Sequence, residues 1–328
     1  MPVDANVLSR WKRWDKVLLG AFCLILVAVP YVIPSFWLRI ATGMFMWITL
    51  ASSWNIIGGY GGYISFGHAA FFGLGAYLTG VLMGQDISFF MAMLIAGTAS
   101  VVSAVILGYP TLRLRGAYFA IATWAFAEVV KQVVLVLPVT GGPFGLRLPA
   151  LLNDAFFYYL MLCLTTVTVL TVYVLLECLS FGLKVKVVRE DEIAAQTIAI
   201  NTSTIKVQAF ALSAFFTAIT GSAYAYWITY IHPESVMSAI ITDQMVVMAL
   251  LGGLGTVLGP IIGASLLYVS NRVFWVIWGD TSFYLVLLGL AICSVILFLP
   301  EGLVSLMRGK RRQVAGALLE TRRIGPRF

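Results

Sequence analysis

Several long stretches of this sequence contain no charged residue at all. They cover residues 17–38, 87–112, 155–176 and 244–271. Each is longer than the roughly 20 residues that an α-helix needs to cross about 30 Å of hydrocarbon. They are continuously apolar, whereas the strands of a membrane β-barrel alternate between lipid-facing and lumen-facing residues. In a chain that is 61% hydrophobic and 11% charged, these stretches predict an all-α, polytopic integral membrane protein.

The spacing of the apolar stretches predicts about eight to ten transmembrane helices. Six precede a polar segment at 177–206 and four follow it, so both groups are even. Residues 1–16, the polar segment and a basic tail at 307–328 are therefore expected on one side of the membrane, and a single membrane domain occupies 17–306. The expected spans are residues 17–34, 38–57, 64–83, 87–110, 116–137, 155–176, 207–230, 240–258, 259–279 and 282–299.

The distribution of basic residues supports this topology. Of the 21 lysines and arginines, 17 fall in the N-terminus, the connection that holds Arg113 and Arg115, the polar segment and the tail. Positive charge accumulates on the cytoplasmic side of membrane proteins, so both termini are predicted to be cytoplasmic. The net charge of +7 is then explained by topology and by contact with anionic lipid. No nucleic acid partner is needed to account for it.

Two glycine-rich places interrupt the apolar pattern. Each has a Gly-Gly-x-Gly core followed by a helix of small residues, which hints at two related halves. Glycine breaks helices and also lets helix backbones approach closely. Broken or re-entrant helices beside a transport pathway and ordinary close packing are therefore both open. The glycines that become candidates for the pathway are Gly58, Gly59, Gly61, Gly252, Gly253 and Gly255.

The polar segment has at its centre KVVREDEIAAQTIAINTS, residues 186–203. A helix is expected near residues 190–198, because its acidic residues would lie in the first turn, where the helix dipole favours negative charge. Such a helix is about 13 Å long and is too short to be stable alone. It either lies on its own protein or transmits motion from a cytoplasmic partner, and Ala194 and Ala195 would let another backbone come close.

The same segment resembles a known family. VVREDEIAAQTIAINTSTIKVQAFALSAFFTAITGSAYA (187–225) is similar to the cytoplasmic coupling segment and following span of LivM-type permeases, the membrane subunits of branched-chain amino acid ABC importers. This sequence departs from the family at Ala199, where glycine is common, and at Ala117, where an acidic residue is frequent. The likeness continues, in the family's order, in LRLRGAYFAIATWAFAEVVKQV (112–133), TGGPFGL (140–146), LLGGLGTVLGPIIGA (250–264) and LPEGL (299–303).

This resemblance implies partners and a role for the polar segment. Residues 189–198 would form a coupling helix that docks on a nucleotide-binding subunit, and ATP-driven closure of two such subunits would rock the spans between inward-facing and outward-facing states. A second, LivH-type permease subunit and a periplasmic or extracellular solute-binding protein complete the expected assembly in the lipid bilayer of the bacterial inner (plasma) membrane. The residues implied in coupling are Arg189, Glu190, Asp191, Glu192, Ile193, Ala194, Ala195 and Ile198.

The chain carries no sequence signature of its own catalysis. It contains no G-x-x-x-x-G-K-[ST] loop, and the nearest fragment, RGKRR at 308–312, lacks both the first glycine and the hydroxyl residue. HExxH, GxSxG and paired-carboxylate arrangements are also missing, and the four cysteines lack the spacing of a metal site. We therefore expect a transport subunit that is not an enzyme, with ATP and Mg²⁺ held by partner subunits and no cofactor or metal on this chain.

Three polar residues at membrane depth are further candidates for the pathway. Glu128 and Lys131 lie on one face of the expected span at 116–137. Ionisable residues at this depth are costly and by default functional, although mutual pairing at this spacing is the simpler account. His68, in SFGHAAFFG, is either part of a pathway wall or a hydrogen-bonded packing residue.

The substrate is left open by these observations. Leucine, isoleucine and valine are the default of the family, while similar permeases import urea, short amides or aromatic amino acids. An ion-coupled secondary transporter is a more distant alternative, because broken helices and internal repeats also occur there. Such a carrier does not need a cytoplasmic coupling segment.

Overall fold

The structure is a computed structural model that describes residues 26–114, 116–278, 289 and 302–304. The expected span at 282–299 except residue 289, residues 17–25 of the one at 17–34, and the terminal segments 1–16 and 307–328 lie outside these residues. Within the described part, residues 26–32 are helical.

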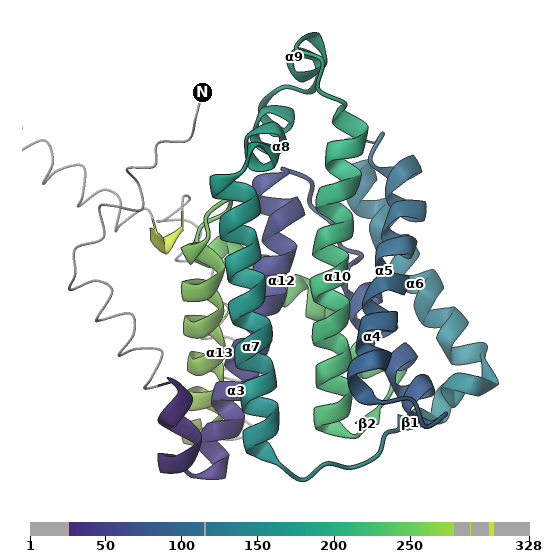
Figure 1. The fold of residues 1–328 in the computed structure, drawn as a ribbon, viewed down its shortest axis with the longest axis vertical. Coiled ribbons are helices and arrows are strands. Elements are labelled where there is room, and N and C mark those ends of the chain that lie inside the picture. Colours follow the sequence, from purple (N-terminus) through teal and green to yellow (C-terminus); the bar gives the residue numbers. More distant parts are fainter. Residues whose placement is uncertain (1–25, 115, 279–288, 290–301, 305–328) are drawn as a thin grey trace, which may run out of the picture.

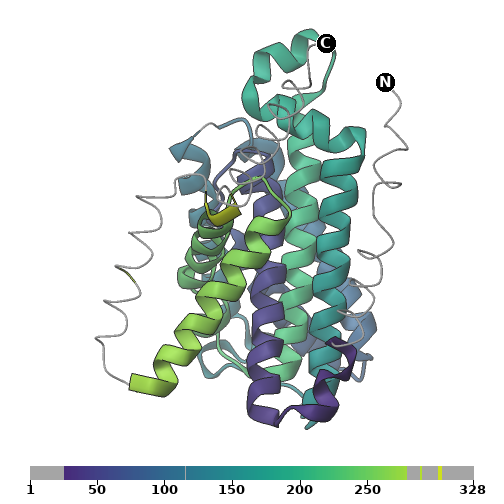
Figure 2. The same cartoon turned by 90° about the vertical axis from the view of Figure 1, so that its left-hand side faces the viewer.

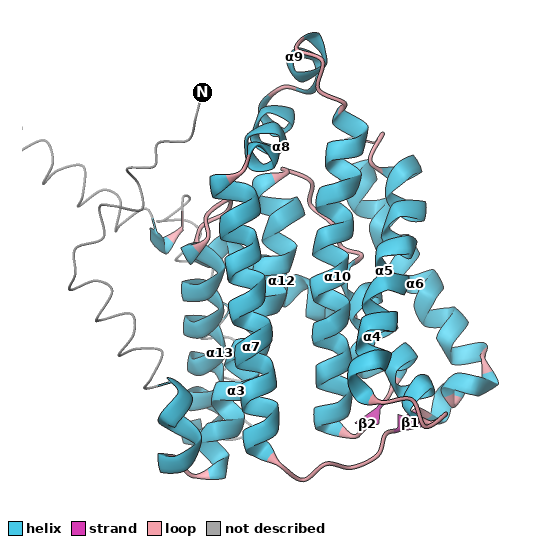
Figure 3. Ribbon diagram, viewed as in Figure 1, coloured by secondary structure: helices cyan, strands magenta, loops and turns pink. Residues whose placement is uncertain are grey.

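The described chain is an α-helical bundle, as predicted (Figures 1 and 3). Six helical stretches of the described chain are long and apolar enough to cross a membrane; two of them include π-helical extensions, and one, Pro233–Gly252, joins two helices. The two π-helical extensions are Ile56–Tyr60 and Tyr173–Cys178, and short 3-10 turns span Pro138–Thr140 and Gly142–Phe144. The helices are α3 (Ser35–Asn55), α4 (His68–Met83), α5 (Phe89–Thr111), α6 (Ala117–Val136), α7 (Asp154–Val172), α8 (Ser180–Glu190), α9 (Glu192–Thr197), α10 (Thr202–Ile228), α11 (Pro233–Val236), α12 (Ala239–Gly252) and α13 (Leu258–Trp278).

Helix α10 lies at the centre of the bundle and packs against α3, α4 and α5 (Figures 1 and 2). Its contact with α4 is formed by backbone. A Cβ atom at Gly75 would lie 1.9 Å from the carbonyl oxygen of Ala218, and one at Gly221 would lie 2.0 Å from that of Phe72. Small residues allow this close approach of helices, which is typical of packing in membranes.

Helix α4 has 16 residues and begins only at His68, which corrects the continuous span expected at 64–83. Residues 61–67 are not helical; they run down into the bundle, and α4 begins at His68 in its interior (Figure 1). Three other helices satisfy polar groups of this backbone. Trp54 Nε1 donates to the Ser65 carbonyl (2.9 Å), and the Phe66 N–H donates to Thr123 Oγ1 (3.1 Å). The Ala69 N–H, in the first turn of α4, donates to Thr242 Oγ1 (2.9 Å). Non-helical backbone is tolerated at membrane depth only where protein satisfies it in this way.

The second glycine-rich place is also a break. Helix α12 ends at Gly252, whereas the expected span continued to residue 258, and α13 begins at Leu258. Gly253 has φ 126° and Gly255 has φ 65°, a region of backbone conformation that favours glycine. The sequence GGLG therefore turns the chain between two helices.

The described connections gather at two ends of the bundle. Helices α8 and α9 project beyond the bundle at the end where α5 and α6 are joined (Figure 1). The two regions are in contact, because the ammonium of Lys206, near the start of α10, donates to the carbonyl of Leu112 after α5 (3.0 Å). Gly302 packs on Gly253 at the same end. At the opposite end, β1 (Leu146–Arg147) pairs antiparallel with β2 (Tyr230–Ile231). The grouping of the Arg113 connection with the polar segment is as predicted.

Candidate functional site

The corner between α8 and α9 is formed by Asp191. This residue has extended backbone, and its Oδ1 accepts from the N–H groups of Ile193 (2.8 Å) and Ala194 (3.1 Å), so it is the N-cap of α9. Aspartate is among the preferred N-cap residues because it satisfies donors that the helix leaves unpaired. Helix α9 therefore begins at Glu192, while Glu190 ends α8. The short helix is Glu192–Thr197 rather than the expected residues 190–198.

Helix α9 is followed by a sharp turn at Ala199, whose φ is 59°. This left-handed conformation costs a residue with a Cβ roughly 1–2 kcal/mol, which gives a physical reason for the glycine that resembling sequences carry here. Asn201 then caps α10, because its Oδ1 accepts from the Thr204 N–H (3.1 Å). The turn fixes the position of α9 between α8 and α10.

The two alanines of α9 differ in their surroundings. Ala195 is fully buried against this chain, whereas Ala194 is exposed. Ile193 and Ile198 are 65% and 63% exposed. Helix α9 thus presents an apolar face at the tip of the projecting segment, and Ala194 belongs to that exposed surface while Ala195 does not.

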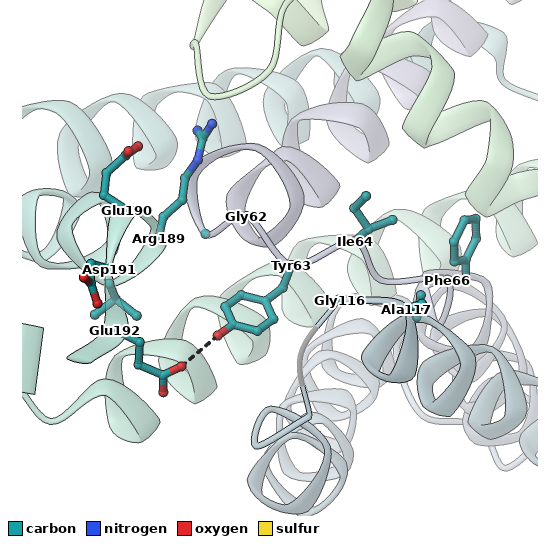
Figure 4. Close-up of a pocket in the computed structure, with 13 residues that line it drawn as sticks. Gly62, Tyr63, Ile64, Phe66, Gly116, Ala117, Arg189, Glu190, Asp191 and Glu192 are labelled. Atoms are coloured by element: carbon teal, nitrogen blue, oxygen red, sulfur yellow. Dashed lines mark hydrogen bonds between the residues drawn. The ribbon is translucent and has the colours of Figure 1, made fainter. Parts of the chain in front are cut away.

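A buried lysine connects α9 to the interior. Lys206, on α10, forms an ion pair with Glu192 of α9 (Nζ to Oε1, 2.6 Å), and the two side chains are only 5% and 17% exposed. The same ammonium donates to Tyr63 Oη (2.9 Å) in the non-helical segment 61–67. The phenol of Tyr63 in turn donates to Glu192 Oε2 (3.4 Å) (Figure 4). In the sequence, Lys206 is one of several basic residues of the polar segment, and no spacing distinguishes it.

The two glycine motifs meet beside this cluster. A Cβ atom at Gly59 would lie 2.5 Å from the Gly255 nitrogen. Asn55 joins the motifs, because its Nδ2 donates to the Thr256 carbonyl and its Oδ1 accepts from the Gly255 N–H, both at 3.0 Å. Arg189 Nη1 donates to the Gly59 carbonyl (2.7 Å). Arg189 Nη1 would also lie 3.2 Å from an added Cβ at Gly255, so the end of α8 lies against both glycine motifs.

The other four glycines that were candidates are also close-packed. An added Cβ would meet Trp54 at Gly58, the Ile57 carbonyl at Gly61 and the Gly259 carbonyl at Gly252, while Gly253 is already contacted by Gly302. The glycines of both motifs thus pack closely and lie at or beside helix ends, while a position beside a transport pathway stays a prediction.

A cavity of about 650 Å³ lies between these elements. Three segments that are far apart in the sequence line it (Figure 4). Each segment contributes one of the residues Tyr63, Ala117 and Glu192 to the wall. Ala117, at which this sequence departs from the family that it resembles, is thus a cavity residue. The full lining is Gly61, Gly62, Tyr63, Ile64, Phe66, Gly116, Ala117, Ala120, Val188, Arg189, Glu190, Asp191 and Glu192.

His68 is fully buried at the start of α4 and is not among the residues that line this cavity. Its Nε2 lies 2.6 Å from Ser213 Oγ, and that hydroxyl donates to the Ser53 carbonyl. The ring must therefore donate through Nε2, while Nδ1 has no hydrogen-bond partner among the described residues. Phe71 and Phe210 pack edge-on against the ring. These contacts are those of a packing histidine, and a role in the pathway stays a prediction.

The expected pair Glu128–Lys131 is present, with 3.0 Å between Nζ and Oε1. Lys131 also lies 3.7 Å from Glu234 beyond the end of α6, a partner that sequence spacing could not reveal. The Glu128 side chain is 44% exposed, and Gln132 Nε2 donates to it (2.9 Å). Helix α6 therefore carries a carboxylate that is paired with Lys131 and Gln132 and is still partly exposed.

Comparison with known proteins covers all of these elements. A family model described as branched-chain amino acid transport system / permease component matches residues 36–296. A high-affinity branched-chain amino acid transport system permease protein LivM from Salmonella typhimurium is 29% identical over 337 residues, which cover 92% of this chain and 78% of the relative. The protein of the same name from Escherichia coli is 28% identical over 339 residues, with the same coverage. No solved structure matches this chain. The family match includes both glycine motifs, the cavity and the α8–α9 segment.

Proposed function

Because the chain belongs to the family of branched-chain amino acid transport system permease components, we propose that it is the membrane subunit of an ATP-driven importer. The observation that carries the proposal is the α8–α9 segment, which projects beyond the bundle and ends in an exposed apolar face (Figure 1). A carrier driven by an ion gradient has no use for such a surface. The chain supplies half of the pathway, and two ATP-binding subunits on the cytoplasmic side supply the energy.

The surface of the corner fits a soluble partner. Ile193, Ala194 and Ile198 offer apolar contact, and Glu190 and Asp191 beside them are exposed and charged. A protein interface commonly has such an apolar centre with a polar rim. Arg189 extends from the same corner to the glycine motifs, so a force applied to the corner reaches the bundle. ATP and Mg²⁺ are held by the partner chains in this proposal, and no cofactor is assigned to this one.

The second permease subunit covers the side of this chain that carries α6. Of the six spans, α6 has the smallest share of buried residues, 22%, yet it carries the exposed Glu128 carboxylate. A charged group facing lipid is costly, so protein or a water-filled pathway must lie against it. This requirement supports a pathway formed between α6 and a second, LivH-type subunit.

The solute-binding protein docks at the opposite end of the bundle. There, His232 Nε2 lies 2.8 Å from the Pro143 carbonyl and Tyr230 donates to the Phe144 carbonyl (2.8 Å), so the two outer connections form one surface. In this orientation the α8–α9 corner faces the cytoplasm and the protein lies in the bacterial inner membrane. The relatives that are named for branched-chain amino acids make leucine, isoleucine and valine the proposed substrates.

Uptake by proteoliposomes tests the proposal. The complete importer is reconstituted with ATP inside and the binding protein outside, and labelled leucine, urea and phenylalanine are offered separately. ATP-dependent accumulation of leucine alone supports both class and substrate. Accumulation of urea or phenylalanine instead would retain the class and change the substrate. Accumulation that ignores ATP but follows an ion gradient would refute the ATP-driven class.

A further inference from the structure

Lys206 has all three donor hydrogens of its ammonium group engaged. They are directed to Glu192 Oε1 (2.6 Å), Tyr63 Oη (2.9 Å) and the Leu112 carbonyl (3.0 Å). An ammonium has three donors and no more. The three acceptors belong to three different elements: α9, the non-helical segment 61–67 and the connection after α5. A single side chain on α10 therefore holds three elements together.

Burial makes this link stiff. The Lys206 and Glu192 side chains are 5% and 17% exposed, and separating two desolvated charges leaves each of them without compensation. The Lys206 ammonium also lies 4.9 Å from the ring centroid of Tyr63, within the range of a cation–π contact. Any movement of α9 that keeps the ion pair must therefore move Lys206 and Tyr63 with it.

Tyr63 carries that movement to the cavity. It lies on the cavity wall and belongs to the non-helical segment that leads into α4. Its ring also packs edge-on against Phe119 of α6, with 5.5 Å between centroids. The cluster thus connects the short helix by direct contacts to α6 and to the segment that leads into α4.

A second ion pair at the same end offers a contrast. Lys186 and Glu177 lie 2.9 Å apart, but their side chains are 41% and 33% exposed. Exposed pairs contribute little, because water screens them and the side chains lose entropy in forming them. Lys186 therefore provides a matched control for the loss of a lysine from the same region.

We propose that Lys206 is a positioning residue that ties the coupling helix α9 to Tyr63, so that displacement of α9 by a cytoplasmic partner reshapes the wall of the cavity. The inference rests on the proposed function, because it needs a partner that moves α9. It adds the residue by which that movement reaches the pathway. A residue that served only to hold the fold together would affect ATP hydrolysis and uptake alike, whereas loss of this link uncouples one from the other.

The test measures leucine imported per ATP hydrolysed in proteoliposomes that contain the complete importer. For Lys206→Met we expect ATP hydrolysis to continue while the ratio falls by about tenfold, within the usual range of coupling between sites. Tyr63→Phe keeps the ion pair and removes only the hydroxyl, and we expect a fall of about fivefold. Lys186→Met should keep the wild-type ratio.

Each outcome decides between the alternatives. If both Lys206→Met and Tyr63→Phe keep the wild-type ratio, the inference is overturned, even where both rates fall together. If Lys206→Met fails to assemble, Tyr63→Phe decides alone. A fall in the leucine imported per ATP hydrolysed supports the inference, and a wild-type ratio overturns it. Failure of the proposed function gives a different result, because the wild-type importer itself would then show no ATP-dependent uptake.

Discussion

The crossing of α4 and α10 allows a quantitative prediction for Gly75→Ala. The new Cβ would lie 1.9 Å from the Ala218 carbonyl oxygen, so the two helices must separate by more than about 1 Å to restore ordinary contact, which costs about 1–3 kcal/mol as overpacking. Separation also breaks the hydrogen bond from Ser222 Oγ to the Gly75 carbonyl (3.0 Å), a loss of about 1 kcal/mol. Alanine recovers about 1 kcal/mol through its higher helix propensity. The net expectation is destabilisation by about 1–3 kcal/mol.

The assay is unfolding of the purified protein in detergent, followed by intrinsic fluorescence. Gly84→Ala is the matched control at the other end of α4, because its nearest neighbouring atom to an added Cβ is 3.3 Å away and its φ is −65°. We expect the control to change stability by less than about 0.5 kcal/mol. Gly221→Ala acts on the same crossing, so its effect and that of Gly75→Ala should combine to less than their sum. If Gly75→Ala is as stable as Gly84→Ala, the backbone contact described for α4 and α10 is refuted.

Three further predictions concern α9, its turn and the charges of α6. Ala199→Gly removes the strain of an alanine in the left-handed backbone conformation. It should raise the free energy of unfolding by about 0.5–1 kcal/mol, after the entropy cost of glycine is subtracted. A lower melting temperature would argue against the turn at residue 199. Ala194→Trp should abolish uptake and stimulated ATP hydrolysis but leave membrane insertion and melting temperature unchanged, whereas Ala195→Trp, at a fully buried position, should lower the melting temperature itself. Glu128→Gln should lower uptake, because the carboxylate is 44% exposed and does more than pair with Lys131. Uptake should stay low in the double variant with Lys131→Met. Recovery of uptake in the double variant would show that Glu128 serves only to neutralise Lys131.

The class and the order of the spans could be predicted because apolar length and basic residues are local signals. The break at 61–67 could only be suspected, since ISFGHAAFFG is as apolar as the helices around it. What fixes the break is distant in the sequence: Thr123 accepts from Phe66 of the segment, and Thr242 accepts from Ala69 in the first turn of α4. No pattern of spacing marks these two threonines among the many others in the spans.

The candidate site shows the same division between local and distant signals. The short helix was expected from its acids and alanines, but its start was misplaced because Asp191, rather than an earlier residue, caps it. Glu128 and Lys131 were paired correctly, since a spacing of three residues places them on one helical face. Lys206 was passed over, because the residues that surround it come from segments as far as 143 positions away.

The broken start of α4 also has a consequence for how the chain is made. The N–H of Ala69 finds its acceptor in Thr242, 173 residues later, and that of Phe66 finds it in Thr123, 57 residues later. While synthesis proceeds, these donors have no native acceptor until the later helices have left the ribosome, and an unsatisfied N–H in hydrocarbon is costly. With 16 residues, α4 is also shorter than a helix that is readily inserted by itself. It therefore reaches its final depth only after α12 has entered the membrane, so a helix that packs on the central α10 is among the last to settle.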